Sequence, residues 1–415
     1  MSQPDSPYSN SGGISQGTSF QLPFMSNAVA LPKFSDITTK IKGALTFSGS
    51  SMSPSTIAGL VFLVFVIAGL VYTWVRAIGL KQRETGAINT IETARKLQTI
   101  NDKIQDQPLR NFYVKTALNC CCLGEWKNNY VDISALQYAI MQGYRCLDFE
   151  IYSRGNVPVV SASKKNSYYY TETFNDLDFK SVCQHINDNA FTQAPNGGDP
   201  LLINLRIKSN NPRSEFVKGI IDGIKVFPDA RRLAPEYNYE FGGENLGKIP
   251  INNFMGKVII MTDVSNPVVK QFCGNSQDPS VSYCLHQYIN IATTSPFLHH
   301  LEYQMDVKNA PSMDDLIDHN KKNMSIVFPD PPFNKNVDFN VAKIFGCQLI
   351  GMMPQLKDAN LETYNGEFND AGSAFKLKPS ELCYQPVVVE TPPPQNPALS
   401  FAGRNYSTDY ASWSV

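Results

Sequence analysis

The stretch Gly143-Tyr-Arg-Cys-Leu-Asp-Phe-Glu-Ile-Tyr152 has the clearest structural pattern in the chain. From Leu147 onward apolar and acidic residues alternate, which is typical of a strand with two different faces. Because alternate side chains of a strand share a face, Asp148 and Glu150 are predicted to lie on the same side. A second short apolar run, Pro158-Val-Val-Ser-Ala162, follows and is predicted to be another strand.

Short apolar runs alternate with helical segments over residues 111–386. The predicted strands include Leu147–Tyr152, Leu201–Ile207, Val258–Met261 and Cys347–Met352. The predicted helices include Ile133–Met141, Phe179–Asn187 and Ser214–Val226. Strands and helices that alternate over about 250 residues predict an α/β fold with a parallel barrel.

Three segments outside this region have their own composition. Residues 1–55 are rich in Ser, Gly, Pro and Asn, which predicts a flexible arm. Residues 387–415 are Pro-rich and then Ser/Tyr-rich, which predicts an extended tail. Residues 80–110 contain good helix formers, and the apolar residues near their middle have helical spacing, so we expect a helical stalk. These apolar residues are Leu97, Ile100 and Ile104.

Residues 56–79 are predicted to form a single transmembrane helix. They contain the run Ile57–Val75, which has no charged residue. At about 1.5 Å per residue, a helix of this length just crosses a hydrocarbon core of about 30 Å. Tyr72 and Trp74 lie near its C-terminal end, where aromatic rings favour the membrane interface. The lipid membrane is therefore the one partner that we expect from the sequence.

The charges beside the span predict its orientation. Four cations follow it closely and two precede it: Arg76, Lys81, Arg83 and Arg95 against Lys40 and Lys42. The side with more cations normally stays in the cytosol, so we expect the barrel on the cytosolic side of a single-pass protein.

The overall charge and the cysteines exclude several classes of function. Lys+Arg 36 and Asp+Glu 37 give a net charge of -1, so no global field attracts nucleic acid. The nine cysteines are odd in number and contain no CxxC pair, which argues against a disulfide framework or a zinc site. We therefore expect reduced thiols, with the adjacent Cys120, Cys121 and Cys122 packed as small apolar side chains on a strand.

Two separated segments resemble the X and Y halves of phosphoinositide-specific phospholipase C, a family of the phospholipase C-like phosphodiesterases. The first spans residues 114–263 and carries Arg145-Cys-Leu-Asp-Phe-Glu-Ile-Tyr152, Pro158-Val-Val-Ser-Ala-Ser163, Pro200-Leu-Leu-Ile-Asn-Leu205 and Ile249-Pro-Ile-Asn-Asn-Phe-Met-Gly-Lys-Val-Ile-Ile260. The second spans residues 318–382 and carries His319-Asn320, Val327-Phe328-Pro329, Gly346-Cys347-Gln348-Leu349 and Gly366-Glu-Phe-Asn-Asp-Ala-Gly-Ser-Ala-Phe-Lys-Leu-Lys-Pro379. The resemblance implies a distorted TIM barrel with its chemistry at the C-terminal ends of the strands.

The chain departs from the family at both catalytic histidines. The first histidine position holds Leu118 and the second holds Ala162, and neither side chain can transfer a proton. Asn119, which follows Leu118, matches a calcium ligand of the family. Loss of one general acid–base group typically costs about 10²–10⁴-fold in rate. We therefore expect no catalytic residue, and a barrel mouth where Leu118 and Ala162 face each other across an inert cleft.

The resemblance also implies an altered metal site, in which Asp148 and Glu150 stand for two calcium-binding carboxylates. The third carboxylate position holds Arg206. We expect Arg206 to form a fork with both acids in place of calcium; two carboxylates and one arginine give -2 + 1 = -1, and three carboxylates with Ca²⁺ give -3 + 2 = -1. The alternative is that both acids face solvent or cap loops. The expected remnant pocket is therefore Asn119, Asp148, Glu150 and Arg206, with no metal, unless the site binds calcium after all.

The family's binding groups for ring phosphates are replaced as well. Two lysine positions hold Met261 and Asp263, and an arginine and a tyrosine position hold Ile326 and Phe328. The remaining histidines lie outside the motifs: His185 on a predicted helix, His299-His300 in the connection between the halves, and His319. We expect these histidines to be structural or exposed.

Three functions compete on these observations. The first is a membrane-anchored, catalytically inactive barrel that acts as a scaffold or interaction protein, with protein partners unknown. The second is a divergent phosphoinositide phospholipase C, a phosphoric diester hydrolase, that uses another base such as Asp148, Glu150 or His185. The third is a module that binds lipid or headgroup without turnover.

Overall fold

The computed structural model describes residues 53–89, 97–165, 170–211, 213–239, 245–270, 284–331, 335–386 and 402–415, and the single residues 394, 396 and 399. The chain divides into two compact units, Met1–Thr73 and Trp74–Val415. The predicted N-terminal arm lies outside the described residues except for its last positions.

The first described element is the long helix α2, Pro54–Asn89, of 36 residues. Within the described residues it is the one helix long and apolar enough to cross a membrane, and none of its most apolar window is buried. At about 1.5 Å per residue a helix of this length exceeds the 30 Å core of a bilayer. The helix therefore continues beyond the predicted span of residues 56–79, as a single uninterrupted element.

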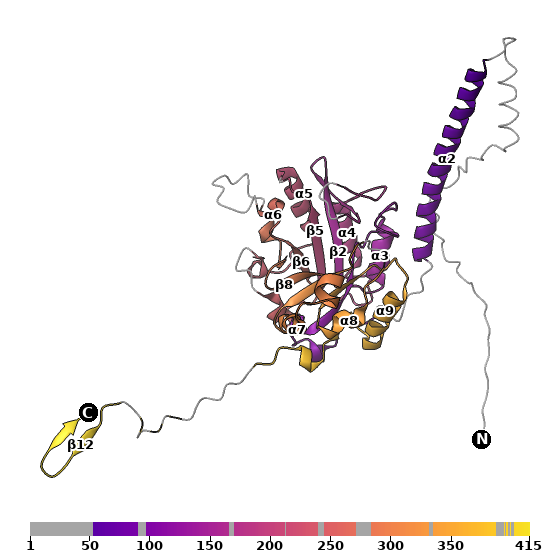
Figure 1. Ribbon diagram of the computed structural model, residues 1–415. Coiled ribbons are helices and arrows are strands. Elements are labelled where there is room, and N and C mark those ends of the chain that lie inside the picture. The colour runs from indigo at the N-terminus through magenta and orange to yellow at the C-terminus, as the bar shows by residue number, and fades with distance from the viewer. Residues whose placement is uncertain are drawn as a thin grey trace, which may run out of the picture. The chain divides into compact units, whose positions relative to one another are not determined.

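Eight parallel strands form the core of the second unit, in the order β7-β6-β5-β2-β1-β10-β9-β8 among the described residues (Figure 1). The ring is nearly closed, because each neighbour in this order is paired and only β7 and β8 lack a ladder between them. This arrangement confirms the prediction of a distorted TIM barrel. The strands are β1 Phe112–Ala117, β2 Cys146–Arg154, β5 Leu201–Lys208, β6 Val258–Asp263, β7 Ile291–Thr293, β8 Leu298–Glu302, β9 Met324–Phe328 and β10 Leu349–Met352.

Helices cover the outside of the ring, with α3, α4 and α5 around β2 and β5 (Figure 1). Asp132 and Asp178 begin α3 and α4, and each side chain accepts a backbone N–H of the first turn. The helix predicted for Ile133–Met141 has these bounds in the structure. The helices of the barrel are α3 Ile133–Met141, α4 Phe179–Asn189, α5 Ser214–Ile224, α6 Pro267–Lys270, α7 Met313–Lys322, α8 Phe339–Ile344 and α9 Ala359–Ala371.

Three short strands extend the sheet in the antiparallel sense: β3 Val157–Ser161, β4 Leu177–Asp178 and β11 Phe375–Leu377. The turn between β2 and β3 consists of Gly155 and Asn156, which both have positive φ, at 56° and 68°. Two left-handed residues in a two-residue loop match the twist of the paired strands. This turn fixes the register of β3 on β2, which brings Ser161 opposite Glu150.

The helical stalk predicted for residues 80–110 is confirmed over residues 80–89 and wrong over residues 97–110, and the part between them lies outside the described residues. Helix α2 ends at Asn89, and Leu97 and Ile100 belong to the buried core of the barrel without being helical. The backbone N–H of Ile100 donates to Asp199 Oδ1 at 2.8 Å, which fixes this segment to the barrel. Burial of these apolar side chains against the core prevails over the modest helix propensity of the segment.

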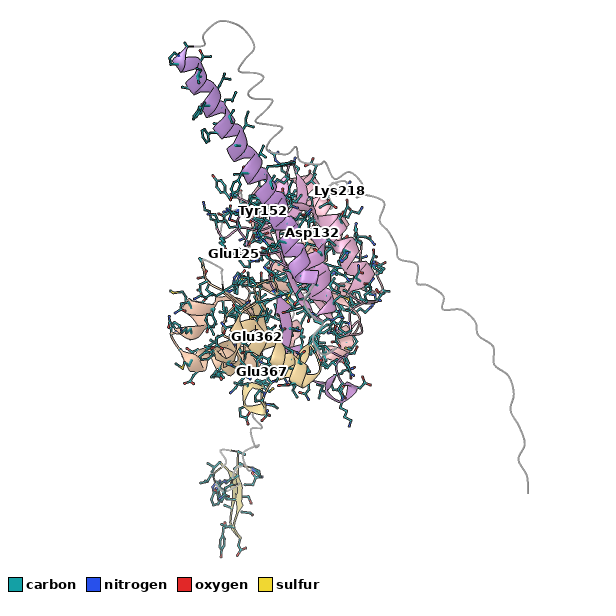
Figure 2. The ribbon with its side chains drawn as sticks, turned by 90° about the vertical axis from the view of Figure 1, so that its right-hand side faces the viewer. Glu125, Asp132, Tyr152, Lys218, Glu362 and Glu367 are labelled. Carbon is teal, nitrogen blue, oxygen red and sulfur yellow. The ribbon has the colours of Figure 1, made fainter. Side chains whose placement is uncertain are left out.

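The C-terminal half of α2 also packs onto the barrel. Ile88 is buried with Leu123 and Ala135, and the ammonium of Lys81 lies 2.9 Å from Asp132 Oδ2. Asp132 is labelled beside the helix in Figure 2. This end of α2 is therefore a packed element and not a free spacer.

Two further sequence predictions are corrected. Cys120, Cys121 and Cys122 are buried, but they form the turn after β1 and not a strand. Cys284 is disulfide-bonded, although the other cysteines of the described residues are free. The tail contains a hairpin, β12 Asn405–Ser407 and β13 Ser412–Ser414, in place of a purely extended chain.

Two lysines of the barrel, Lys115 and Lys378, are buried. Lys115 on β1 is fully buried, and its Nζ donates to the carbonyl of Gln142 at 3.0 Å and lies 4.7 Å from the ring centre of Tyr144. Burial lowers the pKa of Lys115 to about 7. Burial likewise lowers the pKa of Lys378 to about 7.

These lysines predict that the barrel becomes more stable as the pH rises above 7. The unfolded chain keeps each ammonium protonated up to a pKa of about 10.4, whereas the folded chain releases the proton near 7. The unfolded state therefore binds more protons in this window, and each lysine contributes on the order of 1–2 kcal/mol between pH 7 and 9.

Denaturant titrations of the wild type and Lys115→Met across this window measure the effect. The variant is expected to show a smaller rise in unfolding free energy with pH. Lys180→Met, which removes the same charge from an exposed position of α4, is the control. A Lys115→Met slope equal to that of the wild type contradicts the prediction.

Candidate functional site

Neighbouring strands bring the predicted site residues together at the C-terminal ends of β2 and β5. The two strands are parallel, with Asp148 opposite Asn204 and Glu150 opposite Arg206. Residues in register on adjacent strands project from the same face of the sheet. The acids and the arginine therefore meet on the inner face of the barrel.

Arg206 forms the predicted fork with both carboxylates. Its Nη2 and Nε donate to Asp148 at 2.6 Å and 2.9 Å, and its Nη1 donates to Glu150 Oε1 at 2.6 Å. Nη2 also donates to Asn119 Oδ1 at 3.0 Å. Both acids are buried, so the alternative that they face solvent is wrong. The four residues of the predicted pocket are in direct contact.

The remaining oxygens of the acids have further donors. The Tyr152 hydroxyl and the Ser163 N–H donate to Glu150 Oε2 at 2.8 Å and 3.0 Å. Asn204 Nδ2 donates to Asp148 Oδ1 at 2.8 Å. Buried carboxylates are tolerated only when they are paired and hydrogen-bonded in this way.

Two aromatic rings cover the guanidinium of Arg206. Its Cζ lies 5.1 Å from the ring centre of Phe328 and 5.8 Å from that of Trp126. Burial alone would lower the pKa of Arg206, but the charges of Asp148 and Glu150 outweigh it and raise the pKa. Arg206 is therefore a permanent cation at this position.

The residues present do not fit a calcium ion. Calcium requires six to eight oxygen ligands, and the guanidinium already uses oxygens of Asp148, Glu150 and Asn119. Among the described residues, no three His, Cys, Asp or Glu side chains are grouped as metal ligands. Two buried amide atoms beside Asp148, Asn119 Nδ2 and Asn204 Oδ1, have no hydrogen-bond partner in the described chain. Asn119 Nδ2 is a hydrogen-bond donor, so a bound cation would leave it without a partner.

The two positions of the family histidines lie in the core and not across an open cleft. Leu118 and Ala162 are fully buried in the main hydrophobic cluster. Leu118 covers Gly351 of β10 so closely that a Cβ on this glycine would lie 2.6 Å from its side chain. The predicted inert cleft between them is therefore wrong, because apolar side chains at these positions pack together and exclude water.

The open space at the barrel mouth is a pocket of about 190 Å³ next to Arg206. It is also lined by Lys208, Asp263, His300 and Phe328. The sequence analysis missed His300, which it placed in the connection between the halves. His300 lies on β8, and its ring centre is 4.2 Å from that of Phe328. The sequence Leu298-His-His-Leu-Glu302 does not alternate between apolar and polar residues, so no pattern in it could have identified His300, which is exposed at the pocket.

The environment of His300 favours its neutral form. Burial lowers its pKa to about 4, and the positive charge of Arg206 contributes in the same direction. The other four histidines lie elsewhere. His185 bonds Gln137 at 2.7 Å, His286 packs on Tyr239 with ring centres 5.2 Å apart, and His299 stacks on His319 with ring centres 3.6 Å apart. His300 is therefore the one histidine that lines this pocket in the described chain.

The residues that stand at the family's phosphate-binding positions lie in two different environments, the core and the mouth pocket. Met261 and Ile326 are fully buried in the core. Asp263 lines the pocket, where it accepts a hydrogen bond from the Thr294 hydroxyl at 2.7 Å. Thr294 has a φ of 62°, a strained conformation for a β-branched residue.

Comparison with known proteins identifies the class of this barrel. Residues 105–263 match the family described as phosphatidylinositol-specific phospholipase C, X domain. No curated protein matches the sequence. The chain thus carries a phospholipase C-like barrel, as the sequence motifs predicted, and the family match covers the first of the two segments.

Three solved structures are similar to this barrel to different degrees. PLC21 of S. officinalis is 14% identical with a TM-score of 0.50, over 67% of this chain and 38% of that chain. PLC21 of L. pealei is 15% identical with a TM-score of 0.49, over the same shares. A calcium-dependent phosphoinositol-specific phospholipase C of Pseudomonas sp is 12% identical with a TM-score of 0.40, over 67% of this chain and 98% of that chain. The chain spans well under half the length of the PLC21 proteins.

Arg206→Glu is predicted to make the stability of the barrel depend on calcium. The substitution places a third carboxylate beside two buried ones and leaves them without their cation. Loss of one partner of a buried pair costs about 3–5 kcal/mol, and calcium is expected to restore part of it. Thermal unfolding with calcium and with EDTA measures the effect.

Arg154→Glu is the matched control, because Arg154 pairs with Asp176 at an exposed site where its side chain is 47% exposed. An exposed pair contributes about 0–1 kcal/mol, so this variant is expected to unfold close to the wild type in both buffers. Equal stabilisation of the wild type and Arg206→Glu by calcium contradicts the prediction.

Proposed function

We propose that this protein is a membrane-anchored phospholipase C-like barrel without catalytic activity, which acts as a scaffold or interaction protein. The observation that carries the proposal is the fork of Arg206 to Asp148 and Glu150. This cation occupies the acids that would otherwise bind calcium or act as bases. Because both carboxylates are buried, displacement of the guanidinium would leave two buried charges without their cation.

The loss of the family histidines supports the same proposal. Each general acid–base group contributes about 10²–10⁴-fold, so absence of both removes most of the expected rate. Leu118 and Ala162 are part of the core, which also leaves no room for water in their place.

The size of the mouth pocket argues against turnover of phosphorylated headgroups. Its volume of about 190 Å³ is smaller than the roughly 300–1,000 Å³ of common ligand sites. Asp263 adds negative charge where the family has a cation, and this opposes a polyanionic ligand.

Anchoring through α2 is part of the proposal. Burial of the apolar residues Ile57–Val75 in lipid removes a large exposed apolar surface from water. The cations after the span favour a cytosolic barrel, whereas the disulfide of Cys284 is more typical of an oxidising compartment. We give more weight to the cations than to the disulfide, because the cations determine the orientation of the span when it inserts into the membrane. Release of the chain from membranes by alkaline carbonate contradicts the anchoring.

The second candidate function is a divergent phosphoric diester hydrolase that uses His300. Asp148 and Glu150 are bound to Arg206, and His185 is bonded to Gln137 away from the mouth pocket. His300 is the one histidine that lines the pocket in the described chain, and it is neutral near pH 7.

An assay of the full chain tests the proposal. The protein is reconstituted into vesicles that contain phosphatidylinositol and its phosphates, and release of water-soluble inositol phosphates is measured with calcium and with EDTA. We expect release equal to that of vesicles alone in both buffers, because Leu118 and Ala162 replace the two histidines and Arg206 occupies the two carboxylates.

Release above that background contradicts the proposal. His300→Ala then decides between the two functions, since loss of the release assigns it to His300. The control is His185→Ala, which removes an imidazole outside the pocket.

A further inference from the structure

The outer face of β6 is not covered by a long helix in the described chain. Between β6 and β7 the structure describes only α6, of four residues, and the 3-10 helix Leu285–Gln287. Most strands of a barrel of this kind are followed by a helix that buries their outer face. The outer side chains of β6 therefore have to be covered in another way.

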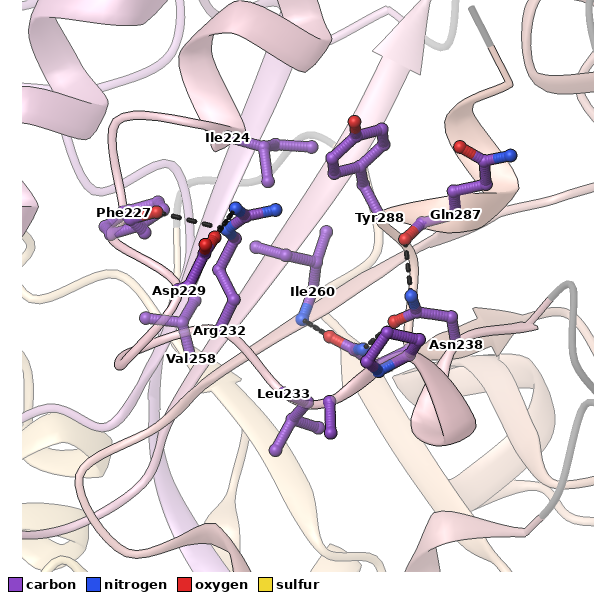
Figure 3. A pocket seen from close by; sticks show the side chains of 13 residues that line it. Ile224, Phe227, Asp229, Arg232, Leu233, Asn238, Val258, Ile260, Gln287 and Tyr288 are labelled. Atoms are coloured by element: carbon purple, nitrogen blue, oxygen red, sulfur yellow. Dashed lines mark hydrogen bonds and ion pairs between the residues drawn. The ribbon is translucent and has the colours of Figure 1, made fainter. Parts of the chain in front are cut away.

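A cavity of about 570 Å³ lies at this place (Figure 3). Val258 and Ile260 of β6 line it, together with Ile224 at the end of α5. Ile260 points away from the barrel interior, because its neighbour Met261 pairs with Asn204, whose amide contacts Asp148 inside. The cavity shares no lining residue with the mouth pocket.

The apolar side of the cavity is built from residues that are almost fully buried. Phe227 and Leu233 complete the apolar lining beside Ile224, Val258 and Ile260. The volume lies within the roughly 300–1,000 Å³ typical of small-molecule sites, and it is three times that of the mouth pocket. A ligand of this cavity therefore needs an apolar body.

Two amides of the cavity are occupied by the protein itself. Asn290 accepts the backbone N–H of Ile260 at 2.8 Å and donates to Asn238 at 3.0 Å. Asn238 in turn donates to the carbonyl of Gln287 at 2.6 Å. These bonds, drawn in Figure 3, make a rigid polar wall and do not leave a free group for a ligand.

A cation and a phenol line the cavity near Ile260. Arg232 lies with its Cζ 5.9 Å from the ring centre of Tyr288, and Lys225 approaches the same ring at 5.5 Å. Arg232 Nε donates to the carbonyl of Phe227 at 3.1 Å, which holds the side chain in place. Figure 3 shows Arg232 and Tyr288 at the edge of the apolar surface of Ile260.

The charge of Arg232 is available to a ligand. Its ionic partner is Asp229, whose side chain is 92% exposed. Exposed ion pairs contribute only about 0–1 kcal/mol, so Asp229 can return to water at little cost. Asp229 itself lines the cavity, so an anionic ligand replaces this carboxylate on Arg232.

We propose that this cavity binds an amphipathic monoanion, a compact apolar body with one carboxylate or similar acidic group. The apolar body occupies the space between Ile224, Val258 and Ile260, and the acid pairs with Arg232. Tyr288 also lines the site. This site lies on the outside of the barrel, so it is independent of catalysis at the mouth and of the proposed function there.

Photolabelling of the full chain in lipid nanodiscs tests the proposal. The probe is a short alkyl carboxylate that carries a diazirine, and the adducts are located by mass spectrometry of peptides, which separates this site from probe dissolved in lipid. We expect adducts in residues 224–238 or 285–290. Arg232→Gln is expected to reduce them about tenfold, the loss of one charge-assisted hydrogen bond.

Three controls make the result decisive. Arg231→Gln removes the neighbouring arginine, which does not line the cavity, and is expected to keep the labelling. Ala234→Phe narrows the cavity from its rim and is expected to reduce labelling, with a thermal melt to check the fold. The corresponding alkyl ammonium probe is expected not to label these peptides.

Equal labelling by the carboxylate and ammonium probes overturns the proposal, as does unchanged labelling of Arg232→Gln. Adducts confined to other peptides overturn it as well. None of these results depends on phospholipase activity, so failure here is distinguishable from failure of the proposed function.

Discussion

The interaction between one guanidinium and two buried carboxylates determines the character of this barrel. Asp148 and Glu150 are held inside the ring, where an isolated charge would cost several kcal/mol. Arg206 neutralises part of their negative charge. It can do so because β2 and β5 are parallel and in register, so that all three side chains share one face. Trp126 and Phe328 lie beside the guanidinium, whose other side lines the mouth pocket.

The same interaction is the basis for the inactivity that we propose for this phospholipase C-like fold. The charge of the site remains -1 with the arginine inside, as it would with three carboxylates and calcium, so the surrounding strands need no other adjustment. Leu118 and Ala162 then continue the hydrophobic core up to the edge of the site. The barrel keeps its packing while the groups that transfer protons are gone, and the function that we propose follows from this combination.

The sequence predicted the parts of the structure that depend on local pattern. Alternation in β2 gave the shared face of the acids, and the motif resemblance gave the place of Arg206 opposite them. The prediction of a stalk was wrong at Leu97 and Ile100, because their spacing is compatible with a helix and also with a non-helical segment that packs on the core. His300 was missed because its strand is short and outside the motifs. The cavity beside β6 was not predictable, because its lining comes from segments that are far apart in the sequence, from Ile224 to Asn290.

Anomalous X-ray scattering from crystals of the protein grown with manganese, a divalent ion that binds oxygen ligands, tests the central claim most directly. The account predicts density for the Arg206 guanidinium within hydrogen-bonding distance of Asp148 and Glu150, and no anomalous peak between these acids. An anomalous peak bound by the two carboxylates, with Arg206 turned away from them, would contradict it.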